Sequence, residues 1–112
     1  MLSAIEARAV LLEILNGIRR AEKSREMMDA VQLSENDMLR RMQLVYPLLC
    51  KIQMDTIANY GFSADAVGVA KFAQQIAGLE KEDGDVKRLN EELRLIFMPA
   101  LPPAQTERRT NA

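Results

Sequence analysis

Apolar residues in the first part of the chain recur at intervals of three and four, the spacing of one face of an α-helix. The residues of this stripe are Ala4, Ala7, Leu11, Ile14, Ile18 and Ala21. Just before it, residues 3–6 (SAIE) match a capping box, in which a serine hydroxyl and a glutamate carboxylate accept bonds from each other's backbone amides. The pattern predicts a helix that begins after Ser3 and ends between Leu15 and Glu22, because residues 16–17 (NG) favour a turn.

Residues 38–62 form the most continuously apolar stretch of the chain. Between Leu44 and Ile52 the only charged residue is Lys51, and apolar side chains point in nearly every direction around a helix axis. A helix of this kind is covered by neighbours on most sides. We therefore expect residues 38–62 to be the buried centre of the molecule.

A second helix is predicted to begin after Ser24, and its length is the main ambiguity of the fold. Val31, Met38, Val45 and Ile52 keep a seven-residue period, which favours one continuous helix over residues 25–60. The alternative is a new helix cap within residues 34–37 (SEND). A continuous helix would be roughly 54 Å long in a domain about 35 Å across. A bend at Pro47 or a homodimer that covers the overhang would resolve this mismatch.

Helix ends are predicted in the second half of the chain as well. Gly61 is expected in the left-handed position of a Schellman motif with Phe62 folded back, and Ser63 is expected to cap the next helix. Either Asp83 or Asp85 would cap a last helix. The inner face of that helix is predicted to consist of Val86, Leu89, Leu93, Ile96 and Phe97.

These elements predict an all-α fold, a small bundle of about four helices around a long central helix kinked by proline. Residues 1–98 would form a single domain, and residues 99–112 a Pro-rich and then polar tail, expected to be flexible. The residues expected to carry structural roles are Pro47, Tyr60, Gly61, Phe62 and Phe72.

Charge and composition indicate which kinds of partner and which cellular compartment to expect. Fifteen basic residues balance 16 acidic ones, so the net charge gives no reason to expect a nucleic acid or an anionic membrane as a binding partner. The single cysteine, Cys50, lies in the apolar stretch and fits a reducing compartment. Without an apolar run long enough to span a bilayer or a secretory signal, we expect a cytoplasmic protein with access to the nucleus.

The residue inventory excludes most kinds of active site. With no histidine and one cysteine, the chain cannot form zinc sites of the usual Cys/His composition, histidine-dependent triads or a Cys-His pair. Residues 83–85 (DGD) resemble a calcium loop, but Leu79 stands where the first aspartate of that loop must lie. We therefore predict no catalytic residue, no metal site and no cofactor.

Five methionines on the second and central helices allow either core packing or a groove for a partner: Met27, Met28, Met38, Met42 and Met54. One hypothesis is a helical interaction module, as a homodimer or as a subunit of a larger assembly. Its interface candidates are Met27, Val31, Met38, Phe97, Leu101 and Pro102. The alternative is a carrier of a small apolar ligand, with a cavity lined by Met38, Met42, Leu49 and Met54.

Several short motifs add a family resemblance over most of the chain. They are Asn36-Asp37-Met38, Gln43-x-Val45-x-Pro47, Ile57-x-x-Tyr60-Gly61-Phe62-Ser63, Gly68-Val69-x-Lys71-Phe72-Ala73 and Leu93-x-x-x-Phe97-x-Pro99 followed by Leu101-Pro102-Pro103. With these motifs the chain resembles the small, uncharacterised eukaryotic protein C-ten family, whose vertebrate members are associated with brain development. The family pattern has a proline after the first helix, where residues 19–24 here have none. The resemblance implies an all-helical, cytoplasmic protein without enzymatic activity or a known cofactor.

Overall fold

The computed structural model describes residues 1–97, which contain six α-helices and no strand. The helices are α1 (Ala4–Ala21), α2 (Arg25–Ser34), α3 (Met38–Leu44), α4 (Tyr46–Ala58), α5 (Ala66–Glu80) and α6 (Gly84–Phe97). The predicted all-α class is confirmed. The tail predicted at residues 99–112, with the interface candidates Leu101 and Pro102, lies outside the described residues.

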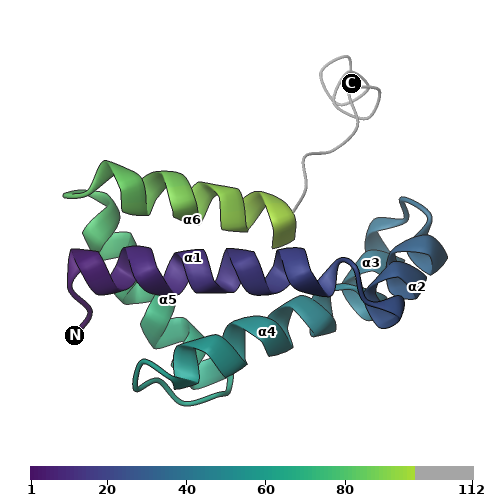
Figure 1. Cartoon of the computed structure of the whole chain (residues 1–112), viewed down its shortest axis with the longest axis horizontal. Helices are drawn as coiled ribbons and strands as arrows, with labels where there is room; N and C mark the ends of the chain where they lie inside the picture. The colour runs from purple at the N-terminus through teal and green to yellow at the C-terminus, as the bar shows by residue number, and fades with distance from the viewer. Residues whose placement is uncertain (98–112) are drawn as a thin grey trace, which may run out of the picture.

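Helix α1 is the buried centre of the molecule. In Figure 1 it runs through the middle, with α6 along one side and α4 along the other, and it also packs on α5. Its inner side chains are at most 1% exposed: Ala7, Val10, Leu11, Ile14, Leu15 and Ile18. Residues 38–62 contribute only Val45, Leu49 and Ile57 to the buried core. The prediction that residues 38–62 form the centre is wrong, because α1 is covered by three helices while α3 lies at one end of the molecule.

The predicted continuous helix over residues 25–60 is also wrong, because a new cap interrupts it. Glu35 and Asn36 adopt left-handed backbone conformations, with φ of 46° and 67°. Asp37 then caps α3, since its Oδ1 accepts bonds from the amides of Leu39 at 2.9 Å and Arg40 at 3.3 Å. Asn tolerates the left-handed region and Asp is a favoured cap, so local chemistry outweighs the seven-residue period.

A second interruption at Val45 separates α3 from α4. The Val45 amide still bonds to the carbonyl of Arg41 at 2.9 Å, and its backbone stays right-handed helical. Pro47 follows in the first turn of α4, where its missing amide costs no helical hydrogen bond. The described chain therefore has three shorter helices, α2, α3 and α4, where one long kinked helix was predicted, and six helices where about four were expected.

Two predicted N-terminal caps are confirmed at α1 and α2. Ser3 and Glu6 form the capping box, with bonds of 3.0 and 3.1 Å. Ser24 caps α2 by accepting from the amide of Met27 at 3.2 Å. Helix α1 continues through Gly17 to Ala21, and a Cβ at Gly17 would lie 3.1 Å from the side chain of Ile52 on α4. Gly17 is thus a site of close helix packing and does not end the helix.

The predicted Schellman motif after α4 is confirmed. Gly61 has φ of 92°, its amide bonds to the carbonyl of Ala58 at 3.4 Å, and the amide of Phe62 bonds to that of Ile57 at 3.3 Å. The Phe62 ring packs edge-to-face on Phe72, with centroids 5.7 Å apart. This contact joins the α4–α5 turn to the core, in which Phe72 is 2% exposed.

We expect Gly61→Ala to lower the free energy of unfolding by about 1 kcal/mol or more, because a side chain would enter the left-handed region. Urea denaturation followed by circular dichroism measures the change. Gly61→Asn is the matched variant and should cost less, since asparagine tolerates this conformation. Equal stability of wild type and Gly61→Ala would contradict the prediction.

Helix α5 begins differently from the prediction, because Asp65 is its cap and Ser63 is not. The Asp65 Oδ1 accepts from the amide of Gly68 at 2.8 Å and from the Ser63 hydroxyl at 2.7 Å. These bonds favour the ionised carboxylate and lower the pKa of Asp65. Ser63, two residues before Asp65, therefore orients the cap of α5.

Helix α6 is capped by Asp83, one of the two predicted residues. Its Oδ1 accepts from the amides of Asp85 and Val86 at 3.0 Å each. The Asp83 Oδ2 also accepts a bond of 2.7 Å from Arg8 on α1. Of the predicted inner face, Val86, Leu89 and Leu93 are buried, while Ile96 and Phe97 are half-buried.

Candidate interaction surface

Exposed apolar side chains are concentrated on α2 and α3, which together we call the α2–α3 hairpin (residues 25–44). Within the described chain eleven large apolar side chains are exposed, and six of them belong to this hairpin. They are Met28, Val31, Leu33, Leu39, Met42 and Leu44, with exposed fractions of 38–65%. Exposed apolar side chains concentrated on one part of a small protein mark a candidate site of interaction.

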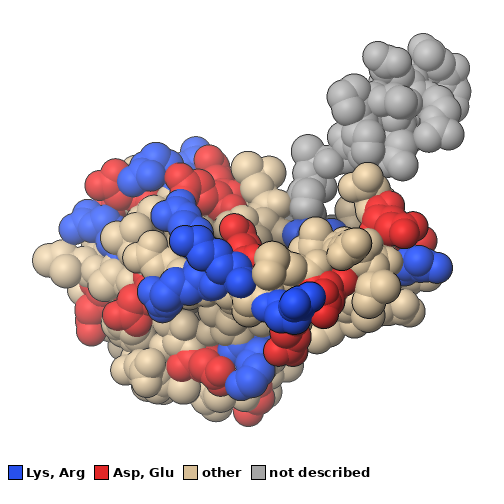
Figure 2. Space-filling view, turned by 45° about the vertical axis from the view of Figure 1, so that its right-hand side comes forward, with Lys and Arg blue, Asp and Glu red and all other residues tan. Residues whose placement is uncertain are grey.

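The position of the hairpin explains this exposure. Helix α2 packs mainly on α3, and α3 packs on α4, so the hairpin lies beyond the C-terminal end of α1 (Figure 1). Figure 2 brings this end forward and shows mostly uncharged surface between separate groups of acidic and basic side chains. The helices that cover α1 therefore leave much of the hairpin's apolar surface uncovered.

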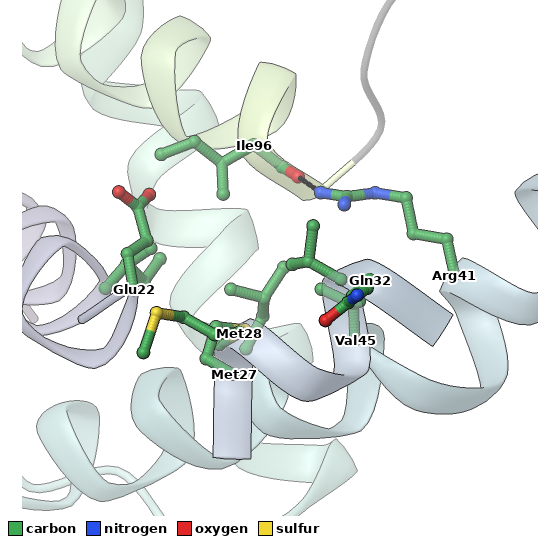
Figure 3. Close-up of a pocket in the computed structure, with 10 residues that line it drawn as sticks. Glu22, Met27, Met28, Gln32, Arg41, Val45 and Ile96 are labelled. Carbon is green, nitrogen blue, oxygen red and sulfur yellow. Dashed lines mark hydrogen bonds between the residues drawn. The ribbon is translucent and has the colours of Figure 1, made fainter. Parts of the chain in front are cut away.

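A groove of about 460 Å³ lies between the hairpin and the ends of α1 and α6, and we call it the α2 groove (Figure 3). It is lined by Ile18, Glu22, Met27, Met28, Val31, Gln32, Arg41, Val45, Leu49 and Ile96. Its inner wall is made by Ile18, Met27, Val45 and Leu49, which are at most 3% exposed. Met28, Val31 and Gln32 are exposed and form its outer edge. The groove is therefore apolar inside and accessible along α2.

Two charged side chains lie on opposite sides of the α2 groove. Arg41 Nη2 donates a bond of 2.7 Å to the carbonyl of Ile96 in the last turn of α6, as the dashed line in Figure 3 shows. Such a cation stabilises the carbonyl end of a helix. Its Nε is buried and has no hydrogen-bond partner among the described residues. Glu22, at the end of α1, lies across the groove from Arg41 (Figure 3).

The structure brings together only part of the predicted interface set. Met27 lies on the inner wall of the groove and Val31 on its outer edge, 3% and 48% exposed. Met38 is half-buried on α3 and does not line the groove. Phe97 packs edge-to-face on Tyr46 with centroids 5.3 Å apart, so it belongs to the α4–α6 contact.

The cavity proposed for an apolar ligand is not formed by the residues that the sequence suggested. Leu49 lines the α2 groove, whereas Met54 lines a different hollow of about 510 Å³ between α4, α5 and α6. Met38 and Met42 line neither of them. The predicted set does not meet because α3 and α4 separate at Val45.

Sequence reasoning missed Arg41 and Leu39 as surface residues of interest. The one signal that could have identified them is the cap at Asp37, since it ends the long helix and leaves α3 a short element with exposed sides. The contact between Arg41 and Ile96 joins residues 55 positions apart and has no local signal.

Reactive and metal-ligating side chains were located among the described residues. They contain no group of three or more Cys, Asp or Glu side chains placed to hold a metal ion. Cys50 is half-buried, and burial raises the pKa of its thiol, which disfavours the reactive thiolate. The hydrogen bond from Tyr60 to Glu13, 2.8 Å long, raises the pKa of the phenol and joins α4 to α1. None of the described helices has the length and apolar character that crossing a bilayer requires.

Comparisons with known proteins point to one family. The family model described as Protein C10 matches residues 3–111. Proteins named Protein C10 from Mus musculus and Homo sapiens are each 36% identical over 104 residues, which cover 91% of this chain and 82% of theirs. The protein of that name from Danio rerio is 33% identical over 104 residues, 91% of this chain and 85% of its own. No solved structure matches.

Proposed function

This chain belongs to the Protein C10 family, and we propose that it is a non-enzymatic helical protein-interaction module that acts as an adaptor or assembly subunit. The observation that carries this proposal is the concentration of six exposed apolar side chains on the α2–α3 hairpin. Completely burying one such side chain contributes about 1.5–3 kcal/mol, so each half-exposed one would add about 1 kcal/mol to binding. The hairpin therefore offers apolar surface whose burial would favour binding to a protein partner.

The chemistry of the hairpin favours a protein partner. Its charged residues are Arg25, Glu26, Asp29, Glu35, Asp37, Arg40 and Arg41, so acidic and basic groups nearly balance. A nucleic acid or an anionic lipid surface would call for a basic excess, whereas a protein surface of mixed charge does not. A cytoplasmic location is part of the proposal, because the single cysteine fits a reducing compartment.

We expect Leu39→Asp to reduce capture of the partner proteins of the tagged full chain about fivefold or more. Leu39 is 65% exposed, so an aspartate there would face the interface without disturbing the core. The measurement is quantitative mass spectrometry of proteins captured from native cytosol. Val67→Asp is the matched control, since Val67 is 59% exposed on α5 and away from the hairpin.

The pattern of loss decides the outcome. Proteins that the wild type and the control retain, and Leu39→Asp loses, are the expected partners of the hairpin. Circular dichroism must show the same melting temperature for the variants and the wild type within a few degrees. Capture that is the same for all three proteins would contradict a binding role of the hairpin.

A second candidate function, a carrier of a small apolar ligand, is favoured by the size and lining of the α2 groove. Its volume of about 460 Å³ lies in the range of ligand pockets, about 300–1,000 Å³. Two thioether side chains, Met27 and Met28, would adapt to an irregular apolar molecule. Native mass spectrometry of the purified full chain tests this candidate, and a spectrum with only the mass of the protein would count against it.

A further inference from the structure

One face of α2 carries opposite charges at its two ends. Arg25, Met28, Val31 and Gln32 lie on one side of α2, because Met28 is three or four residues from each of the others. Glu35 follows the last residue of the helix in a left-handed conformation, and all five residues are exposed. The opposite side holds the buried residues of α2, which are Met27, Ala30 and Ser34. The exposed face therefore has a cation at its start, apolar and amide groups in its middle and a carboxylate at its end.

These charges are placed against the preference of an isolated helix. A helix stabilises acidic groups at its N-terminus and basic groups at its C-terminus. Arg25 is the first residue of α2, and Glu35 follows its last residue. Neither forms an ion pair within the described chain, whereas other surface charges do, such as Lys51 with Asp55 at 2.9 Å. Neither charge is therefore paired directly in the described monomer, and the carboxylate one helical turn from Arg25 on α2 belongs to Asp29.

A second copy of the same helix in antiparallel orientation would compensate both. Positions 25 and 35 are symmetric about position 30, and so are positions 28 and 32. In an antiparallel pair centred there, Arg25 of each copy lies beside Glu35 of the other, and Met28 lies beside Gln32. A two-fold axis repeats each contact, as an interface between identical surfaces requires.

The α2 groove completes the surface for a second copy. Met28 and Val31 belong both to the exposed face of α2 and to the outer edge of the groove. Two copies paired through α2 would each place these side chains over the groove edge of the other. A specific interface buries about 1,200–2,000 Å² in total, so the face of α2 and the groove edge would both have to contribute.

We propose that this face of α2, with the edge of the α2 groove, is a homodimer interface in which two copies pair antiparallel through Arg25 and Glu35. This inference rests on the proposed interaction function and names its first partner as the chain itself. It differs from the surface tested by Leu39→Asp, because Leu39 lies on α3 and does not line the groove.

Charge exchange in the full-length chain tests the proposal. We expect sedimentation velocity at protein concentrations of about 1–200 μM to show a reversible dimer. Arg25→Glu and Glu35→Arg should each weaken dimerisation about tenfold or more, because each places like charges opposite one another twice. The double variant R25E/E35R should restore the dissociation constant to within about threefold of the wild type. The two positions lie about 15 Å apart along one helix, so restoration requires contact between two chains.

An apolar pair of variants provides the matched control. Val31→Asp should weaken the dimer about tenfold or more, whereas Val67→Asp on α5 should leave its dissociation constant unchanged. Thermal melting monitored by circular dichroism verifies that every variant is folded. Both valines are about half exposed, so a change of side chain at either is tolerated by the monomer.

Three results would overturn the inference. They are a wild type that stays monomeric at 200 μM, a dimer that both single charge variants retain, and a double variant that remains as weak as the single ones. A monomeric wild type that still loses captured proteins on Leu39→Asp would remove the homodimer and leave the proposed interaction function intact. If the variants lose neither dimerisation nor captured proteins, both the homodimer and the proposed interaction function are contradicted.

Discussion

We expect Leu11→Ala to lower the free energy of unfolding by about 3–4 kcal/mol, because truncating a buried leucine loses transfer free energy and leaves a cavity. Leu11 is fully buried, with 0% of its surface exposed, in the middle of α1. Helices α4, α5 and α6 all pack on α1, so no single neighbour can move in to fill the space. The loss is a large share of the roughly 5–15 kcal/mol that stabilises a small domain. Urea denaturation followed by circular dichroism measures it.

The adjacent residue supplies the control for this prediction. Leu12 lies on the same helix but is 44% exposed, so Leu12→Ala makes the same chemical change with little loss of burial. We expect it to cost less than about 1 kcal/mol, since exposed positions contribute little. Equal losses for the two variants would mean that the buried face of α1 is assigned incorrectly.

Gly68→Ala is expected to lower the free energy of unfolding by about 3 kcal/mol or more, through a backbone clash at the start of α5. A Cβ at Gly68 would overlap the carbonyl oxygen of Ser63 and lie 2.7 Å from its carbonyl carbon. Overpacking that displaces backbone costs about 1–3 kcal/mol and at times more. The clash would also disturb the bond from the Gly68 amide to Asp65, which caps the helix. The same denaturation measurement applies.

A second glycine of α5 is the control for Gly68→Ala. Gly78 is exposed, and a Cβ added there would meet no atom within 4 Å. Gly78→Ala should therefore stabilise the protein by about 0.5–1 kcal/mol, because alanine has the higher helix propensity. Opposite signs for the two substitutions are the expected result. A stabilising Gly68→Ala would contradict the close approach of Ser63.

The arrangement of the core bears on the proposed function. Helices α4, α5 and α6 all pack on α1 and bury its inner face. The α2–α3 hairpin extends past the end of α1, where no other described helix is available to cover Leu33, Leu39 and Met42 (Figure 1). A partner protein would supply the missing cover, which is the physical reason for the interaction surface proposed above.

Much of the local structure could be predicted from the sequence, because helix ends depend on a few neighbouring residues. The caps at Ser3, Ser24 and Asp83 and the Schellman motif at Gly61 all involve groups within six residues of one another. Where local signals competed, as between the seven-residue period and the cap at Asp37, the interpretation of residues 25–60 failed. The prediction of Met38 as an interface residue was affected for the same reason, since Met38 lies on α3 beyond that cap.

By itself the sequence determined that the chain is helical and where several of its helices begin or end, since a cap or a left-handed glycine acts within one or two turns. Only the tertiary structure decided that α1 is the buried helix, although residues 38–62 are the more continuously apolar stretch. The same holds for the α2 groove, whose lining comes from α1, α2, α3, α4 and α6. Burial and grooves depend on which helices meet in space, and side chains as distant in sequence as Arg41 and Ile96 decide that together.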